Sequence, residues 1–280
     1  TGMLSRANKV APPTSPFTAP NTPLNGIISP RRMWNATLLS LDRLKVLKNT
    51  MDTALNDVLL AICAGALRRY LDEKKKLPDR PLVAMVPICT RNKDEEDKEG
   101  NNISSMLVQL ATNIEDPLDR LEAIHENTVR GKSYQGAIGA KTLANMAEVV
   151  PFGIANQAAK MYSRFQISEL HKPMFNVTIT NVPGPNFPLY INGHKLHSVM
   201  GMAPIIDGMG LIITVFSYDG KVTMSATSDA NSMPDVDIFV RYLREAANEL
   251  ETAVKNHGAR KKRKTVKKKK KKSLQIFILF

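Results

Sequence analysis

A ten-residue segment in the second half of the chain has residue types and spacing that could stabilise a developing negative charge on oxygen. Residues 176–185 read Asn-Val-Thr-Ile-Thr-Asn-Val-Pro-Gly-Pro. On an extended strand, alternation places Val177 and Ile179 on one face and Thr178 and Thr180 on the other. Hydroxyl and amide groups that face a cavity could donate hydrogen bonds to an oxyanion that develops during the reaction. A solvent-exposed strand face is the equal alternative, because Thr is a favourable strand residue in its own right.

The pair Asn56-Asp57 opens the most regular helical pattern of the sequence. Apolar residues recur there at a spacing of three and four from Leu55 to Leu71, which is typical of one buried helix face. Short polar side chains and a carboxylate in the first turn satisfy free backbone N–H groups and suit the helix dipole, and this role is sufficient to explain both residues. The functional alternative is that Asn56 or Asp57 orients a group supplied by another domain.

Histidine is the usual general base when an alcohol is acylated, because its pKa lies near working pH. None of the five histidines has an adjacent histidine or an aspartate four residues on, and His125 falls on a predicted helix face, where a structural role is expected. Phosphate-binding loops of the Walker and dinucleotide types are absent from the sequence. The residues alone therefore indicate no catalytic centre in this chain. The histidines are His125, His171, His194, His197 and His257.

The positive charge of the chain is concentrated at one end. The 280 residues have a formal net charge of +13, and twelve of the 39 basic residues follow the last acidic residue, Glu251. Residues 1–254 carry 27 basic and 26 acidic side chains. The excess of positive charge therefore comes from the tail, and it does not indicate a basic folded body.

The two cysteines, Cys63 and Cys89, lie in apolar surroundings. They support neither a disulfide framework nor a zinc cluster, so we expect no metal site and a reducing, cytoplasmic environment. No apolar run reaches the length of about 18 residues that a spanning helix needs, and the first residues have no signal-peptide pattern. A hydrophobic content of 43% is ordinary for a globular protein with a sizeable core.

The order of elements predicts an α/β fold with a mixed β-sheet flanked by helices. Thr53 is the expected N-cap of the helix that begins near Leu55, and the Asp219-Gly220 pair predicts a hairpin turn. Residues 92–100 are expected to form a solvated loop. We expect strands at 34–41, 82–88, 103–112, 175–182, 195–200, 211–218 and 221–226, and helices at 44–48, 55–71, 117–135, 138–163 and 234–255.

Three regions are predicted along the chain. Residues 1–30 contain six prolines between positions 8 and 30, a composition that keeps the backbone extended and does not bury a core, so we expect an interdomain linker whose upstream domain is missing. Residues 31–255 form the folded domain. Residues 256–280 form a basic, disordered tail.

Several ordered motifs resemble the C-terminal half of the bacterial wax ester synthase/acyl-CoA:diacylglycerol acyltransferase family, and the resemblance covers residues 22–255. The motifs are Leu24-Asn25, Arg31-Arg32, Asn56-Asp57-Val58, Leu60-Ala61, Gly65-Ala66-Leu67-Arg68, Val86-Pro87 with Arg91, Gly100-Asn101, Leu110-Ala111-Thr112, Asp116-Pro117 with Arg120-Leu121, and Asn181-Val182-Pro183-Gly184-Pro185.

The resemblance implies a chloramphenicol-acetyltransferase-like fold of two similar halves, with acyl-CoA and the alcohol meeting in a tunnel between them. The family's catalytic HHxxxDG motif lies in the N-terminal half and does not occur in this sequence. The resemblance therefore implies an O-acyltransferase domain that transfers a fatty acyl group from acyl-CoA to diacylglycerol or a long-chain alcohol, has no catalytic residue of its own and is inactive alone. Its partners would be the N-terminal catalytic half, acyl-CoA as co-substrate with no other cofactor, and the acceptor lipid.

The same resemblance implies roles for residues of this chain. Asn56 and Asp57 match the family's ND motif and would support the site. Thr178 to Pro183 is also similar to the Ser-Thr-Ser strand of carnitine acyltransferases, which makes Thr180 the candidate oxyanion donor, with Thr178 and Asn181 as further residues of the tunnel wall.

The tail has a possible function of its own. Residues 260–272 hold eleven basic residues in thirteen positions and are followed by an apolar end. Such a tail could dock on an anionic membrane or lipid-droplet surface through residues 260–280, at about 1 kcal/mol per basic residue. A non-catalytic module that binds such a surface is therefore the alternative function, and we expect a cytoplasmic protein associated peripherally with membranes or lipid droplets. Nucleic acid is disfavoured as a partner, because no aromatic residues are interleaved with the lysines.

Overall fold

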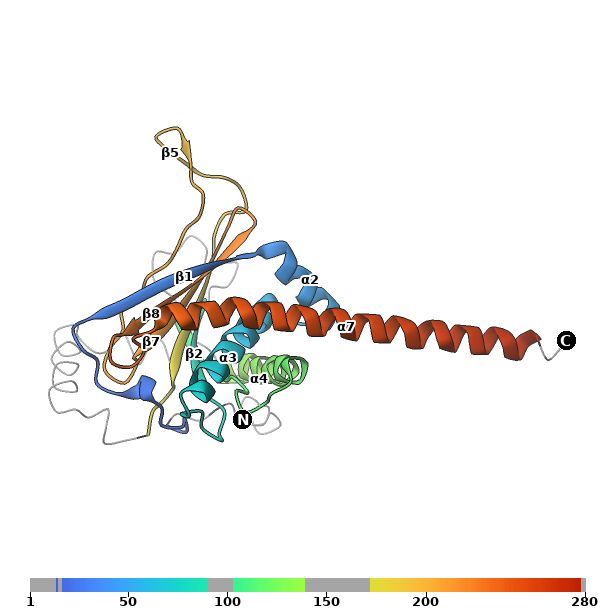
Figure 1. The fold of residues 1–280 in the computed structure, drawn as a ribbon, viewed down its shortest axis with the longest axis horizontal. Helices are drawn as coiled ribbons and strands as arrows, with labels where there is room; N and C mark the ends of the chain where they lie inside the picture. Colours follow the sequence, from blue (N-terminus) through green and yellow to red (C-terminus); the bar gives the residue numbers. More distant parts are fainter. Residues whose placement is uncertain (1–13, 15–16, 90–102, 139–171, 278–280) are drawn as a thin grey trace.

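The computed structural model describes residues 14, 17–89, 103–138 and 172–277 (Figure 1). The loop predicted at 92–100 and the helices predicted at 138–163 lie almost wholly outside these residues. The elements are η1 (Pro23–Asn25), β1 (Arg32–Ser40), α2 (Leu41–Met51), α3 (Leu55–Glu73), β2 (Val83–Cys89), β3 (Ile103–Gln109), α4 (Pro117–Ile138), β4 (Val177–Pro183), β5 (Tyr190–Ile191), β6 (His194–Lys195), β7 (Leu211–Tyr218), β8 (Lys221–Asp229) and α7 (Val236–Phe277).

Six strands form one mixed sheet in the order β1-β8-β7-β4-β2-β3. Strand β4 runs parallel to β2 and β7, and the remaining neighbours are antiparallel. The hairpin between β7 and β8 turns at Asp219 and Gly220, which both have positive φ, as the sequence predicts for this pair. The predicted class, a mixed sheet flanked by helices, is confirmed.

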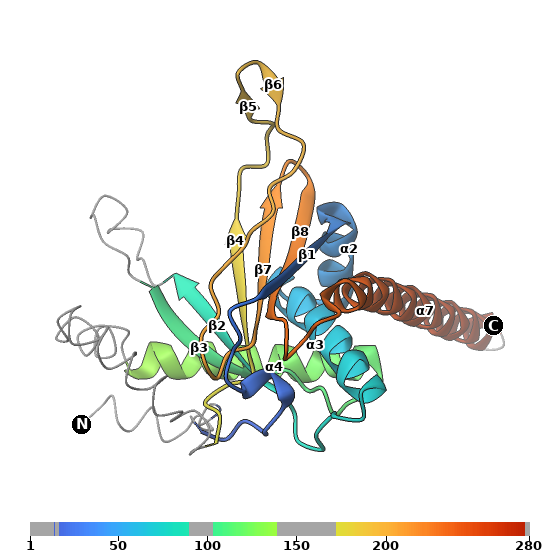
Figure 2. The same ribbon diagram turned by 60° about the vertical axis from the view of Figure 1, so that its left-hand side comes forward.

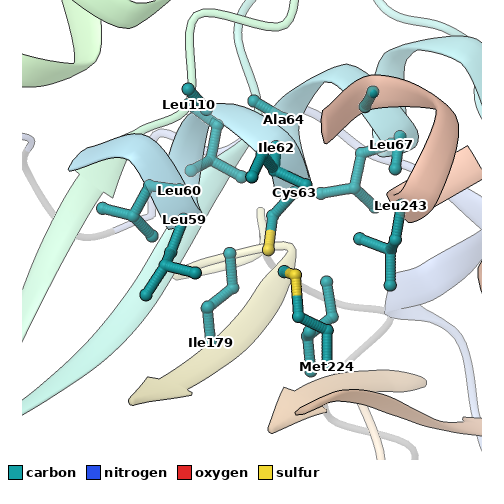
Figure 3. Close-up of a cluster of buried hydrophobic side chains, with 14 of the residues drawn as sticks. Leu59, Leu60, Ile62, Cys63, Ala64, Leu67, Leu110, Ile179, Met224 and Leu243 are labelled. Carbon is teal, nitrogen blue, oxygen red and sulfur yellow. The ribbon is translucent and has the colours of Figure 1, made fainter. Parts of the chain in front are cut away.

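The hydrophobic core lies between one face of the sheet and the helices. The residues that the strands contribute to the core all belong to one set of alternating positions, including Ile179 and Met224. Figure 3 shows the Cys63 side chain of α3 pointing toward these two residues. Because Cys63 is fully buried, its pKa is raised well above the ordinary value, and its thiol stays protonated in the core.

Helix α3 crosses the centre of this core, and most of its side chains are buried. The predicted N-cap at Thr53 is wrong by one residue. The N-cap is Ala54, whose side chain cannot cap, and the Asp57 carboxylate instead accepts a hydrogen bond from the Ala54 N–H at 3.0 Å. The carboxylate at the third helical position thus does the capping.

The segment expected to be a linker packs on the domain from Ala19 onward. Leu24 is fully buried, and the Asn25 amide donates to the carbonyls of Phe175 and Gly208 at 2.9 and 3.0 Å. Asn176 in turn donates to Asn25 Oδ1 at 2.8 Å. The expectation that this proline-rich stretch buries no core side chain is wrong, because Leu24 and Asn25 follow the last closely spaced prolines and form a short 3-10 turn.

The predicted strand at 195–200 is also mostly wrong. Only His194 and Lys195 pair, with Tyr190 and Ile191, to form a two-stranded arm (residues 186–196) that projects from the end of the sheet (Figure 2). The next residues form a strap (residues 199–206) whose carbonyls accept hydrogen bonds from the sheet. Apolar residues in this part of the chain cover the sheet from outside rather than extending it.

Helix α7 begins at Val236, close to the predicted start, and its backbone continues as helix to Phe277 (Figure 1). A disordered tail was expected from residue 256. Lysine and arginine have high helix propensity, and a helix that is already nucleated on the core needs only propagation to continue.

Within the described residues, no single helix has the length and hydropathy of a membrane span. Helices α2 and α3 meet that criterion only together, as a pair bent by 103°.

Candidate functional site

The first turn of α3 lies against the end of β4. The Asn181 amide nitrogen approaches Asn56 Oδ1 to 3.5 Å. Asn181 shares the helix-facing side of β4 with Ile179, because the two residues are two positions apart. The two motifs that the sequence singled out, Asn56-Asp57 and residues 181–185, are therefore brought together across 125 positions of the chain.

Asp57 is buried, with 1% of its side chain exposed. Its Oδ2 accepts from the Ala54 N–H and lies 2.7 Å from His125 Nδ1, and its Oδ1 accepts from the Thr128 hydroxyl at 2.7 Å. A buried carboxylate needs such partners, because leaving one oxygen unpaired costs about 1–3 kcal/mol or more. Oδ1 of Asp57 therefore contacts α4, and Oδ2 contacts both α4 and the N-terminus of α3.

Sequence reasoning missed the partners of Asp57. His125 and Thr128 lie three residues apart on the predicted helix at 117–135, so a shared face could be inferred. Their contact with Asp57 spans 68 and 71 positions of the chain, and no local spacing indicates it. The expected structural role of His125 agrees with this geometry.

Thr178 and Thr180 point to the opposite face of the sheet from Asn181. Thr178 is buried, and its hydroxyl lies 2.8 Å from the Met209 sulfur. Thr180 is half-buried and pairs with Thr214, which in turn pairs with Ser225 on β8. The five site residues expected from sequence thus lie in two groups, one on each face of β4.

A row of hydroxyls on this outer face was not predicted. Ser225 and Thr227 are buried, and within the described part of the chain their hydroxyls have no hydrogen-bond partner. The strap crosses beside them, and its Gly201 carbonyl accepts from Thr214 and from the Trp34 indole N–H, at 3.0 and 3.2 Å. The alternation of Thr223 and Ser225 in the strand predicted at 221–226 was the available signal, and the observed strand continues it to Thr227.

A cleft of about 380 Å³ lies elsewhere, between α3, α7 and the loop before α4. Burial lowers the pKa of Arg120 in its wall, and Arg120 donates to the carbonyls of Ile114 and Glu115. Arg68 donates to the Thr112 carbonyl at 2.8 Å. These arginines hold the loop before α4, and the acidic residues Asp72, Glu115 and Glu249 line the same cleft. Among the described residues, no cluster of three His, Cys, Asp or Glu side chains is placed to hold a metal ion.

Two protein-family models together match most of the chain. Residues 99–251 match the family described as the WS/DGAT C-terminal domain. Residues 2–59 match the wax ester synthase/diacylglycerol acyltransferase catalytic domain. A Mycobacterium tuberculosis protein named a diacylglycerol O-acyltransferase is 38% identical over 242 residues, which cover 86% of this chain and 52% of that protein. The O-acyltransferase WSD of Acinetobacter baylyi is 35% identical over 86% of this chain and 51% of its own length.

Solved structures agree with these matches. The wax ester synthase/diacylglycerol acyltransferase from Marinobacter aquaeolei superposes with a TM-score of 0.65 and 28% identity, over 90% of this chain and 55% of that one. The starter condensation domain of rhizomide synthetase has a TM-score of 0.50 at 13% identity, over 90% of this chain and 51% of that one, and shares the fold alone.

The chain spans about half the length of the curated relatives it matches. The match to the C-terminal family domain covers more than half of this chain and includes β3, α4, the strands from β4 to β8, and α7 up to residue 251. The chain therefore belongs to the wax ester synthase/diacylglycerol acyltransferase family, of which it contains the C-terminal domain.

Proposed function

We propose that this chain is the C-terminal half of an acyl-CoA-dependent O-acyltransferase that forms triacylglycerol or wax esters. The family match over residues 99–251 carries the proposal. The contact between Asn56 and Asn181 supports it, because it brings two motifs of the family resemblance to one place. The chain lacks the HHxxxDG motif, so the proposal includes inactivity of this half alone.

The proposed reaction divides its groups between the two halves. The second histidine of the motif in the N-terminal half removes the proton of the acceptor hydroxyl. The alkoxide oxygen then attacks the thioester carbonyl of acyl-CoA, the C–S bond breaks, and CoA leaves as the thiol. From this half, Thr180 would donate a hydrogen bond to the oxyanion of the tetrahedral intermediate.

The arm is proposed to contact the N-terminal half. Phe187, Leu189, Tyr190 and Ile191 are 40–62% exposed and lie close together in sequence on this projection. Contiguous exposed apolar residues mark interaction surfaces in soluble proteins. The matched relatives are about twice as long as the matched region, so the half that they contain in addition is the proposed occupant.

Co-expression with an N-terminal half that carries HHxxxDG tests the proposal. Thiol release from long-chain acyl-CoA should require both halves and an acceptor, either diacylglycerol or a long-chain alcohol. The matched control replaces the second histidine of the motif by alanine. A folded two-half complex with no acceptor-dependent thiol release would refute the proposal.

A second candidate function is docking on an anionic lipid surface, and the course of α7 favours it. The helix leaves the folded body and projects away from it (Figure 1), and eleven of the thirteen residues at 260–272 are basic. The proposal includes a peripheral location on cytoplasmic membranes or lipid droplets. Vesicles with anionic lipid should float the full chain but not a chain ending at residue 255, and binding should weaken as salt rises. Equal flotation of the two chains would refute it.

A further inference from the structure

The Asp57 carboxylate joins the start of α3 to α4 at one point. It caps the start of α3 through the Ala54 N–H and contacts α4 through His125 and Thr128. With 1% of its side chain exposed, it has no open side for a substrate. The neighbouring Asn56 is half-exposed and contacts Asn181. Within the pair, the Asp57 side chain therefore stabilises the fold, and the Asn56 side chain is the one that other groups can reach.

We propose that His125 and Thr128 are positioning residues for the Asn56-Asp57 pair. By holding the Asp57 carboxylate, they fix the rotation of the first turn of α3 about the helix axis and its position along that axis. This places Asn56 against Asn181 at the end of β4. The inference rests on the proposed function, because it assigns these two α4 residues to the same site. They act through Asp57, which both of them contact.

The contact also sets the state of the histidine ring. A carboxylate 2.7 Å from Nδ1 accepts a hydrogen bond only if that nitrogen carries the proton, so neutral His125 is the Nδ1–H tautomer. The Thr128 hydroxyl has a second acceptor within reach, the His125 carbonyl at 2.9 Å. Its single proton favours Asp57, because hydrogen bonds to an ionised acceptor are the stronger ones.

Three variants of this chain, assembled with the N-terminal half, test the inference. Thr128→Val removes the hydroxyl at nearly constant shape, and His125→Leu removes the ring donor. His125→Asn keeps a nitrogen donor attached to Cγ, as Nδ1 is. We expect Thr128→Val and His125→Leu to lower kcat about tenfold with KM unchanged, and His125→Asn to stay within about threefold of wild type.

The matched control is Thr252→Val, because the Thr252 hydroxyl donates to a carbonyl of its own helix at the surface. All kinetics are measured at a temperature where circular dichroism shows every variant fully folded. A purely structural cluster would lower the unfolding temperature and leave kcat of the folded complex unchanged. The inference is overturned if folded Thr128→Val and His125→Leu keep kcat within twofold of wild type, or if His125→Asn loses as much as His125→Leu.

Nuclear magnetic resonance on the isolated 280-residue chain separates this inference from the proposed function. The ring ¹⁵N shifts of neutral His125 should show the proton on Nδ1. The side-chain amide signal of Asn181 should move in Thr128→Val and His125→Leu, and stay in place in His125→Asn and Thr252→Val. These outcomes support the positioning role even if the wild-type complex transfers no acyl group. An Nε2–H tautomer, or an Asn181 signal unmoved in all variants, would contradict it.

Discussion

Asn181 at the end of β4 approaches Asn56 in the first turn of α3, with 3.5 Å between the amide nitrogen of the former and Oδ1 of the latter. This pair is where two motifs far apart in the sequence meet. Its weak, partly exposed hydrogen bond adds little to stability, so its proposed importance lies in where it holds the two amides relative to the proposed N-terminal half.

A double-mutant cycle on this pair tests that role. We expect Asn56→Ala and Asn181→Ala each to lower kcat of the two-half enzyme about tenfold, and the double variant to lower it by about the same factor, because both remove one interaction. Asn248→Ala on the exposed face of α7 is the control and should leave kcat unchanged. Multiplicative losses in the double variant would show that the two residues act separately.

Thr180 is predicted to contribute a hydrogen bond to the oxyanion. Thr180→Val in the two-half enzyme should lower kcat about a hundredfold, as removal of such a donor typically does. Thr178→Val is the comparison on the same face, because the Thr178 hydroxyl is already engaged with the Met209 sulfur, and it should cost far less. A kcat for Thr180→Val within about threefold of wild type would end this assignment.

Asp229 makes the stability of the domain depend on pH. Burial by itself would raise its pKa, but hydrogen bonds from the Ser29 hydroxyl and backbone, and from the backbone of Ser232 and Asn231, outweigh burial and lower it. The folded pKa then lies below the unfolded value of about 3.9. The ionised group therefore stabilises the fold above that value, and this contribution is lost as the pH falls through the folded pKa.

Urea unfolding measures this effect. At pH 7, Asp229→Asn should lower the free energy of unfolding by about 2 kcal/mol, because hydrogen bonds to a charged acceptor are lost. The difference from wild type should narrow below about pH 4. Asp42→Asn is the control, since Asp42 is exposed and its carboxylate pairs with the exposed Lys45 at 3.6 Å. A difference that stays constant from pH 7 to pH 3 would show that ionisation of Asp229 is not the cause.

Gly184 is predicted to be required by close packing. A Cβ added there would overlap the Ser217 carbonyl oxygen and the Phe216 ring of the neighbouring strand. Gly184→Ala should therefore destabilise the domain by about 2–3 kcal/mol, because the backbone of β7 must move. Gly26→Ala is the matched control, since among the residues that the structure describes, apart from its two chain neighbours, none has an atom within 4 Å of the added Cβ. Equal urea midpoints for the two variants would contradict the packing argument.

The elements of this protein could be predicted largely from local patterns. The spacing of apolar residues predicted α3, α4 and most strands close to their observed bounds, because a half-buried helix or strand must repeat its apolar side chains at its own period. Predictions failed where the environment overrides composition. The strap at 199–206 has strand-like residues but lies across the sheet, and the proline-rich stretch is held by Leu24 and Asn25.

The sequence by itself determined the family, the separation of the basic tail from a nearly neutral body, and the candidate residues Asn56, Asp57 and Thr180. Only the tertiary structure decided which of them meet. The Asp57 carboxylate contacts His125 and Thr128, which lie about 70 positions away in the sequence. The Asn181 side chain points toward α3, and the Thr180 side chain points to the opposite face of the sheet. Such contacts depend on how helices and strands pack after the chain has folded, and the spacing of residues along one element carries no information about its partner.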